Sequence, residues 1–504
     1  MDADVSVLRR LVGLLGIFLA AITTSLATRM GTLALADVRG ALGFGFDAAS
    51  WLTTAHAAAE LIAMPFSAWF AITVAMRRFV SWVIALSAAA CLLVPWAHSL
   101  EWMLVLRVIQ GLAGGALIPL LMMAALKFLP APVKLYGLAL YSLTATLAPT
   151  LAIWLVGVWT DHYADWRLVY WQSLPLLAMA GALSAWGLPR DAARPERWRQ
   201  CNWIGLACGA AALGALAVAL DQAVRLDGFQ SPLIAFCTYA GLLLLAAYLY
   251  SEWRHPDPFL QLRLLARRNL GLGFTIFVCM LTLLSCASLL PVGYLGRVWG
   301  YRALQSAPIG LIIGVAQLVL APAVAALLYR KWLDARIMFS LGLVLIACAC
   351  WQSAGLTSAW VWQQFIWVQA LNALGQPMAV VSLLFLATSV VQPREGPYVS
   401  GTINTLRGLG SLLAGTVVGQ ALVVRERWHA EGLLDRLGRV SGILPGTDAP
   451  SLAAPLHEQA FVMATADVYR AAGLLALLLI PLVLSLHRRQ PPASLPEQSH
   501  PHPG

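Results

Sequence analysis

Charged residues are scarce in this chain of 504 residues, because Asp, Glu, Lys and Arg together make up only 11% of it. An ordinary soluble protein contains about 25%. Hydrophobic residues reach 60%, and the mean hydropathy is +0.76. Intrinsic disorder requires the opposite composition, and a water-soluble surface cannot be built from so little charge. The composition therefore predicts a polytopic membrane protein.

The sequence also lacks the common signatures of enzymes and metal sites. It contains no Ser/His/Asp arrangement, no HExxH motif, no glycine-rich phosphate loop and no nucleotide-binding domain. Its eight cysteines lie in or beside apolar runs without paired metal-ligand spacing, which predicts buried free thiols. The net charge of +10 comes from short basic clusters between apolar runs. Such clusters are better explained by the orientation of the chain in a membrane than by binding to nucleic acid. We expect no enzyme activity, no cofactor and no metal.

Fourteen runs are long enough to cross a bilayer as helices, which takes about 20 apolar residues each. They lie at about 11–35, 50–72, 78–98, 101–126, 134–159, 167–188, 202–220, 232–251, 269–296, 305–328, 337–356, 360–388, 397–424 and 468–486. With the N-terminus in the cytoplasm, 20 of the 33 Lys and Arg residues fall in inside loops, 10 fall in outside loops and three fall within spans. The positive-inside rule therefore predicts a multi-pass membrane protein with both termini cytoplasmic.

Charges inside the predicted spans identify the candidate site, because ionisable groups there are costly and usually functional. Only Glu60, of 23 acidic residues, lies well inside a span, about 15 Å from its start. His56 is one turn away on the same face, and Arg29 and Arg107 lie in the outer halves of their own spans. A carboxyl that water and substrate reach can exchange protons, as a proton-coupled carrier requires. The alternative is a static ion pair of Glu60 with Arg29 or Arg107, and His56 would then only bond a neighbour.

The second half of the chain offers polar residues for a substrate pocket. Gln369 and Asn372 lie on one helical face, and Arg407 is the third basic residue within a span. With Arg29 and Tyr141, these residues form our predicted substrate-binding set. Each amide alone is also typical of an interhelical hydrogen bond.

Two motifs give the chain a family resemblance. The fourth span reads LRVIQGLAGG from Leu106 to Gly115, and the fifth contains Ala148-Pro149-Thr150-Leu151. These segments resemble the LxxRxxQGxGG motif and the antiporter motif of the major facilitator superfamily, specifically its fourteen-helix drug:proton antiporter branch (EmrB/QacA-like). The residues that carry the motifs are Arg107, Gln110, Gly111, Gly114, Gly115 and Pro149. The resemblance assigns Arg107 to proton transfer, gives the other five structural roles, and covers about residues 10–486.

The resemblance implies an all-α fold of fourteen transmembrane helices in two six-helix bundles. The N-terminal bundle would span 1–200, two extra linking helices 201–252 and the C-terminal bundle 253–489. Within the last part, 425–467 reads as a periplasmic excursion of mixed charge with an amphipathic stretch at 428–437. The Pro-rich tail 490–504 is typical of a disordered cytoplasmic segment.

Three departures from the branch bear on coupling. The usual first-span aspartate is missing, and Arg29 stands two residues after its place. The loop Ser67–Thr73 lacks the Gly and Asp of the gating motif, and alanine or isoleucine replaces the usual glycines of the antiporter motif. We therefore assign proton coupling to Glu60, assisted by Arg107 and His56.

The resulting expectation is proton-coupled efflux of hydrophobic drugs or toxic aromatic compounds by alternating access. Arg29 and Arg107 against a single Glu60 would give a positive cavity, which favours weak acids. The EmrB-like part of the branch implies a periplasmic adaptor, for which 425–467 is the only sizeable periplasmic surface, and an outer-membrane channel. Two alternatives remain open: a facilitator or importer of a specific metabolite, and a transport-inactive sensor or scaffold.

Overall fold

The computed structural model describes residues 7–130, 133–330, 333–392, 395–440 and 449–488, and all regular structure in them is helical. The tail 490–504, predicted to be disordered, lies outside these residues. The α-helices are α1 (Val7–Leu33), α2 (Leu35–Leu42), α3 (Phe46–Ala63), α4 (Ser67–Val74), α5 (Met76–Leu93), α6 (Leu100–Phe128), α7 (Lys134–Gly157), α8 (Leu168–Trp171), α9 (Ser173–Gly187), α10 (Trp203–Gln222), α11 (Pro232–Arg254), α12 (Arg268–Val298), α13 (Ala303–Tyr329), α14 (Ala335–Ser353), α15 (Phe365–Thr388), α16 (Gly396–Val440) and α17 (Ala449–Leu484). Short 3₁₀ or π turns are η1 (Val94–Trp96), η2 (Val158–His162), η3 (Pro195–Gln200), η4 (Gly228–Gln230), η5 (Leu262–Ala266) and η6 (Trp362–Gln364).

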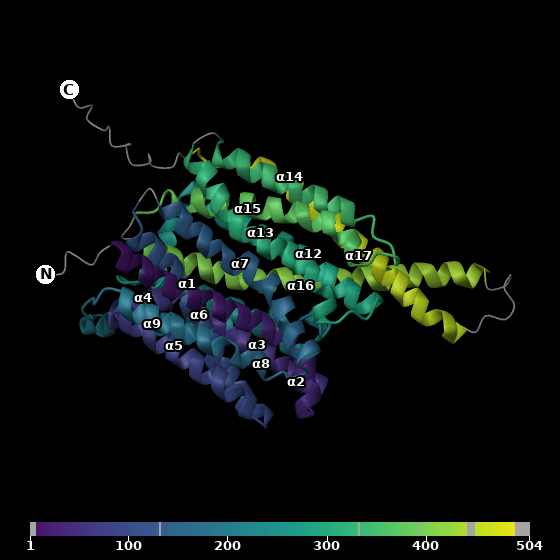
Figure 1. Ribbon diagram of the computed structural model, residues 1–504, viewed down its shortest axis with the longest axis horizontal. Coiled ribbons are helices and arrows are strands. Elements are labelled where there is room, and N and C mark those ends of the chain that lie inside the picture. Colours follow the sequence, from purple (N-terminus) through teal and green to yellow (C-terminus); the bar gives the residue numbers. More distant parts are fainter. Residues whose placement is uncertain (1–6, 131–132, 331–332, 393–394, 441–448, 489–504) are drawn as a thin grey trace.

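The predicted fourteen spans are confirmed, with one break. Thirteen helices of the described residues are long and apolar enough to cross a membrane, and the pair α3 and α4 adds a fourteenth as one bent span. This pair bends by 57° around Pro65, a residue that has no backbone N–H to continue a helix. Helix α1 begins and α17 ends at the same end of the molecule (Figure 1). We call this the inner end and the opposite end the outer end.

The helices form two packed groups that meet along a long seam. Helices α1, α3, α5, α6, α7 and α9 contact one another, as do α12–α17 (Figure 1). The seam runs along α7 against α13 and α6 against α16. Helix α11 packs on α10, which contacts α3 of one group and α16 of the other. The boundaries 1–200, 201–252 and 253–489 stay a prediction.

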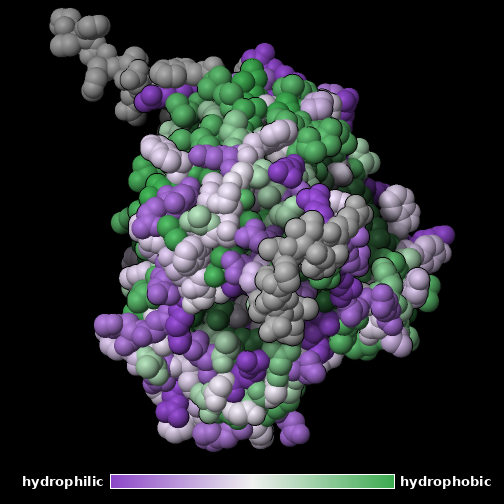
Figure 2. Space-filling model, turned by 90° about the vertical axis from the view of Figure 1, so that its right-hand side faces the viewer, coloured by the Kyte–Doolittle hydropathy of each residue, from purple (hydrophilic) through white to green (hydrophobic). Residues whose placement is uncertain are grey.

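Helices α16 and α17 project beyond the other helices at the outer end (Figure 1). The excursion predicted at 425–467 is therefore a helical hairpin in its described part. Ala430, Leu433, Leu456 and Ala460 pack between its two arms. Figure 2 looks onto this end, where hydrophilic residues gather around the hairpin.

Asp257, in the segment between α11 and η5, holds the inner end together. Its carboxylate pairs with Arg197 of η3 at 2.8 Å and accepts hydrogen bonds from Trp69 of α4 and Tyr398 of α16, both at 3.3 Å. The Arg197 guanidinium also lies over the Trp69 ring. Residues of both groups thus meet on one carboxylate, at the place where the sequence lacks the usual gating residues.

Two glycines of the fourth-span motif let α6 touch the backbone of α3. A Cβ on Gly111 would overlap the carbonyl oxygen of His56, and a Cβ on Gly115 would overlap that of Glu60. Their neighbour Gly114 faces α1 instead, where a Cβ would lie 3.6 Å from Thr24. Two of the motif glycines therefore fix the distance between α6 and the part of α3 that carries His56 and Glu60.

These contacts predict opposite effects for two adjacent substitutions. Gly115→Ala should cost about 1–3 kcal/mol through overpacking, whereas Gly114→Ala should cost almost nothing. Thermal unfolding of the purified protein in detergent measures both. Equal melting temperatures for the two variants would show that α6 does not depend on backbone contact at Gly115.

Candidate functional site

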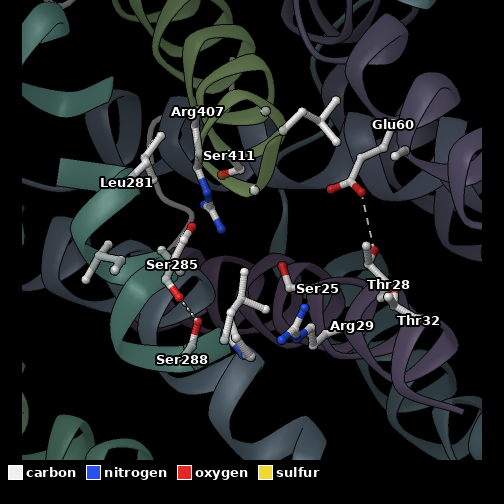
Figure 3. Close-up of a pocket in the computed structure, with 18 of the residues that line it drawn as sticks. Ser25, Thr28, Arg29, Thr32, Glu60, Leu281, Ser285, Ser288, Arg407 and Ser411 are labelled. Carbon is white, nitrogen blue, oxygen red and sulfur yellow. Dashed lines mark hydrogen bonds between the residues drawn. The ribbon is translucent and has the colours of Figure 1, made fainter. Parts of the chain in front are cut away.

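A cavity of about 490 Å³ lies between the two groups of helices (Figure 3). Its walls come mainly from α1, α3, α7, α12 and α16, with one edge supplied by the end of α10. The size is within the usual range for small-molecule sites. Leu61, Ile118, Leu281 and Ile313 are among the apolar residues that line it. The charged or titratable side chains that line it are Arg29, His56, Glu60, Asp221 and Arg407.

Glu60 faces α1 across this cavity. Its side chain is 16% exposed, and one carboxylate oxygen accepts a hydrogen bond from Thr28 at 3.4 Å (Figure 3). His56 lies one turn earlier, 3.8 Å from the same oxygen and 2.9 Å from the Thr28 hydroxyl. The other ring nitrogen of His56 lies 3.2 Å from the backbone carbonyl of Arg107. Carboxyl, imidazole and hydroxyl therefore form one connected chain at the cavity wall.

Arg29 extends from α1 into the same space, as Figure 3 shows. Its Nε atom is buried and has no hydrogen-bond partner, and no carboxylate of the described residues forms an ion pair with it. A desolvated, unpaired guanidinium is costly in a protein. Its partner is therefore expected to come from outside the chain, as water or as a bound anion.

Arg407 reaches the cavity from α16 (Figure 3). Its guanidinium donates hydrogen bonds to the Thr144 hydroxyl at 2.7 Å and to the Thr144 carbonyl oxygen at 2.9 Å. It also lies 5.6 Å from the centre of the Tyr141 ring, and the Tyr141 hydroxyl donates to Asn404 at 2.8 Å. Because Tyr141 is buried beneath Arg407, it supports this cation and does not line the cavity.

Arg107 does not reach the cavity, contrary to the sequence prediction of a positive cavity made by Arg29 and Arg107. It is 1% exposed and donates to the Gln110 side chain at 3.0 Å and to the carbonyl oxygen of Leu52 on α3 at 3.4 Å. Gly31 leaves room for its guanidinium beside α1. Gln110 in turn donates to the sulfur of Cys91. Neither static pair considered for Glu60, with Arg29 or with Arg107, is present among the described residues.

The amides predicted for the pocket lie elsewhere. Gln369 donates to the carbonyl oxygen of Ala287 on α12, and Asn372 donates to Gln369 and Val368 within α15. Both are buried, and neither lines the cavity. Gln376, one turn further along, does line it. Pro149, the antiporter-motif proline, lies in α7 and also contributes to the wall.

Sequence reasoning missed several lining residues. Asp221 closes the edge beside α3, and its carboxylate accepts a hydrogen bond from Thr54. Ser285, Ser288 and Ser411 add hydroxyls on the side of Arg407 (Figure 3). The helical spacing of Ser25, Thr28 and Thr32 along the first span was a readable signal of a polar face. Asp221 gave no such signal, because it stands at the end of an apolar run.

The charges of the cavity balance when both carboxyls are ionised. Arg29 and Arg407 carry two positive charges, and Glu60 and Asp221 carry two negative ones. None of the four forms an ion pair with another in the described residues. Protonation of the carboxyls would leave the cavity positive, so its affinity for anions would depend on pH.

The chain matches the Major Facilitator Superfamily over residues 15–415. It is similar to the multidrug export protein EmrB of Escherichia coli, with 27% identity over 81% of this chain and 80% of that protein. It is also similar to the fatty acid resistance protein FarB of Neisseria gonorrhoeae, with 23% identity over 93% and 94%, and to the colistin resistance protein EmrB of Acinetobacter baumannii, with 24% identity over 74% and 72%.

Solved structures share the fold. The peptide transporter POT in complex with sulfate aligns with a TM-score of 0.59 and 15% identity, covering 95% of this chain and 96% of that one. The human organic anion transporter TETRAN aligns with a TM-score of 0.56 and 14% identity, covering 93% and 99%.

The contrast between two arginines is testable on the purified protein. Arg29→Met should leave the melting temperature unchanged or raise it, because no hydrogen bond to the protein is lost. Arg107→Met should cost about 1–3 kcal/mol, because Gln110 and the Leu52 carbonyl lose a buried partner. Strong destabilisation by Arg29→Met would contradict its assignment as a cation left free for a ligand.

Proposed function

Because the chain belongs to the major facilitator superfamily, we propose that it exports hydrophobic compounds in exchange for protons, by alternating access between two helical bundles. One observation carries the proposal. Glu60, a carboxyl within a span, lines the central cavity without an arginine or lysine partner. The chain is a transporter and not an enzyme by family, and its EmrB relative from Escherichia coli is a multidrug exporter by name.

Glu60 would bind the transported proton, and His56 would relay it. The Thr28 hydroxyl lies 2.9 Å from His56 and 3.4 Å from Glu60, so a proton could pass along the wall through this hydroxyl. Arg107 acts as a positioning residue in this scheme: its side chain ties α6 to α3, and its carbonyl oxygen faces the His56 ring. The role implied by the family motif is thus exerted through His56.

The cavity suits a hydrophobic anion, with weak acids as the physiological class. Arg29 and Arg407 would bind the acidic group, while leucine and isoleucine side chains would contact the apolar part. The names of two similar proteins point the same way, since one confers fatty acid resistance and another transports organic anions. We propose no binding role for Gln369 and Asn372 in this conformation, since both are occupied in α15.

The site of action would be the bacterial inner membrane, with both termini in the cytoplasm. The outer end, from which the hairpin of α16 and α17 projects, would then face the periplasm. This hairpin is the surface on which a periplasmic adaptor would dock, and the adaptor would connect to an outer-membrane channel. Its arms hold together through Asp467, which bonds Arg425 and His429 on α16 and Arg470 on its own helix.

Replacing Glu60 tests coupling directly. Proteoliposomes with an internal pH dye would receive a pH gradient and then 1-naphthalenesulfonate, a hydrophobic anion that stays ionised and carries no proton through lipid. Wild-type protein should show anion-dependent proton flux, and Glu60→Gln should lower it by about an order of magnitude. A lipophilic cation should give little flux.

Glu101→Gln is the matched control, because Glu101 is an exposed carboxyl at the start of α6. It should leave the flux unchanged. Flux that survives Glu60→Gln would move the coupling site to another group, with His56 as the first candidate. An absence of flux in wild-type protein with either class of ion would favour a facilitator or a scaffold.

Shortening the hairpin tests the adaptor. Residues 431–459 would be replaced by a short turn joining Ala430 to Ala460, which pack together between the arms. Drug resistance of cells should disappear, while flux in proteoliposomes should remain at the wild-type level, since the cavity is untouched. Resistance that persists with the shortened hairpin would refute docking there.

A further inference from the structure

The end of α10 is inserted between the two groups of helices. Leu220, Asp221 and Val224 line the cavity. The backbone carbonyl of Leu220 accepts a hydrogen bond from Thr416 of α16 at 2.6 Å. On the opposite side, the carboxylate of Asp221 accepts one from Thr54 of α3. One of the two extra helices therefore reaches the site and contacts both halves of the molecule there.

Asp221 has no ion-pair partner among the described residues. Its carboxylate is bonded to Thr54 of α3. The other charged or titratable groups that line the cavity are His56 and Glu60 of α3, Arg407 of α16 and Arg29 of α1. Arg225, one turn later, is already bound to Asp47 at 2.6 Å and to Gln222. No arginine, lysine or histidine of the described residues forms an ion pair with Asp221. A static structural role as half of an ion pair is therefore absent.

The hydrogen bonds around Asp221 accommodate both protonation states. The Thr54 hydroxyl lies within bonding distance of two acceptors, the Asp221 carboxylate and the Ser50 carbonyl oxygen, the latter at 3.2 Å. With Asp221 ionised, the hydroxyl donates to it. With Asp221 protonated, the carboxyl donates to Thr54, and the hydroxyl turns to Ser50. Gln222, which also donates to Thr54, keeps this hydroxyl in place. The proton can thus come and go without movement of the heavy atoms.

We propose that Asp221 is a second proton-binding residue of the transport cavity, so that α10 supplies a coupling group and is more than a spacer. The inference rests on the proposed proton-coupled export. Each carboxyl carries one proton, and together they match the two guanidinium groups of Arg29 and Arg407. Exchange would then involve two protons for each anion, one through Glu60 and one through Asp221.

The number of protons per anion tests this proposal. In proteoliposomes with the membrane potential clamped at zero, the 1-naphthalenesulfonate gradient that stops net flux is measured at several pH gradients. The slope of one gradient against the other gives the stoichiometry. Wild-type protein should exchange two protons per anion, and Asp221→Asn should exchange one. Asp227→Asn is the control, because Asp227 lies six residues later, pairs with Arg427 and does not line the cavity. It should keep the wild-type slope.

The outcomes separate the two proposals. No proton flux in wild-type protein would refute proton-coupled export itself. Coupled flux in wild-type protein with the same slope in Asp221→Asn would refute the role of Asp221 alone.

Two further measurements cover an Asp221→Asn variant that does not transport. Proton uptake or release on adding 1-naphthalenesulfonate to detergent-solubilised Asp221→Asn protein should differ by one proton from wild type, and an unchanged count would overturn the proposal.

Thr54→Val keeps the carboxyl of Asp221 but removes its hydroxyl partner. It should shift the pH profile of transport while keeping two protons per anion; an unshifted profile would count against the proposal.

Discussion

The position of the cavity carboxyl depends on the absence of two Cβ atoms. Helix α6 touches the backbone of α3 only because Gly111 and Gly115 lie opposite the carbonyl oxygens of His56 and Glu60. This contact turns the opposite face of α3 toward α1, so that both side chains meet Thr28. Arg107 secures the same three helices, since it binds the Leu52 carbonyl and lies in the space left by Gly31. The fourth-span motif thus acts on the site mainly through packing.

The four charges of the site share a cavity and are not arranged in pairs. A charge in low-dielectric surroundings is tolerable when it is neutralised, solvated or able to lose its proton. Arg29 and Arg407 always carry charge, so the two carboxyls set the net charge that a ligand meets. An arrangement of fixed pairs would be more stable and would also be indifferent to pH. The observed arrangement gives up that stability in return for a variable electrostatic potential.

The sequence predicted most of the fold because hydrophobic length decides where helices cross a bilayer. Its predicted spans agree with the helices to within a few residues, except where Pro65 breaks the second, where α17 begins at Ala449 and not at residue 468, and where α16 continues beyond residue 424. That extension was missed because its residues are charged, although they favour helix. The rule that charges within spans are costly drew attention to Glu60, Arg29 and Arg407, and all three line the cavity. Sequence cannot give the rotation of one helix against another. For this reason Arg107 and Asn372 were wrongly predicted to line the cavity, and Asp221 was not predicted to line it.

Helix α16 both lines the cavity and connects it mechanically to the hairpin. It runs without a break from Gly396 at the inner end, past Arg407 in the cavity, to Val440 in the hairpin. At 1.5 Å per residue it is roughly 65 Å long, about twice the thickness of the hydrocarbon core. Its tip lies about 50 Å from Arg407. A small rotation of the helix about the cavity would therefore become a swing of several ångströms outside the membrane, so a protein held at the hairpin would move with each change at the binding site.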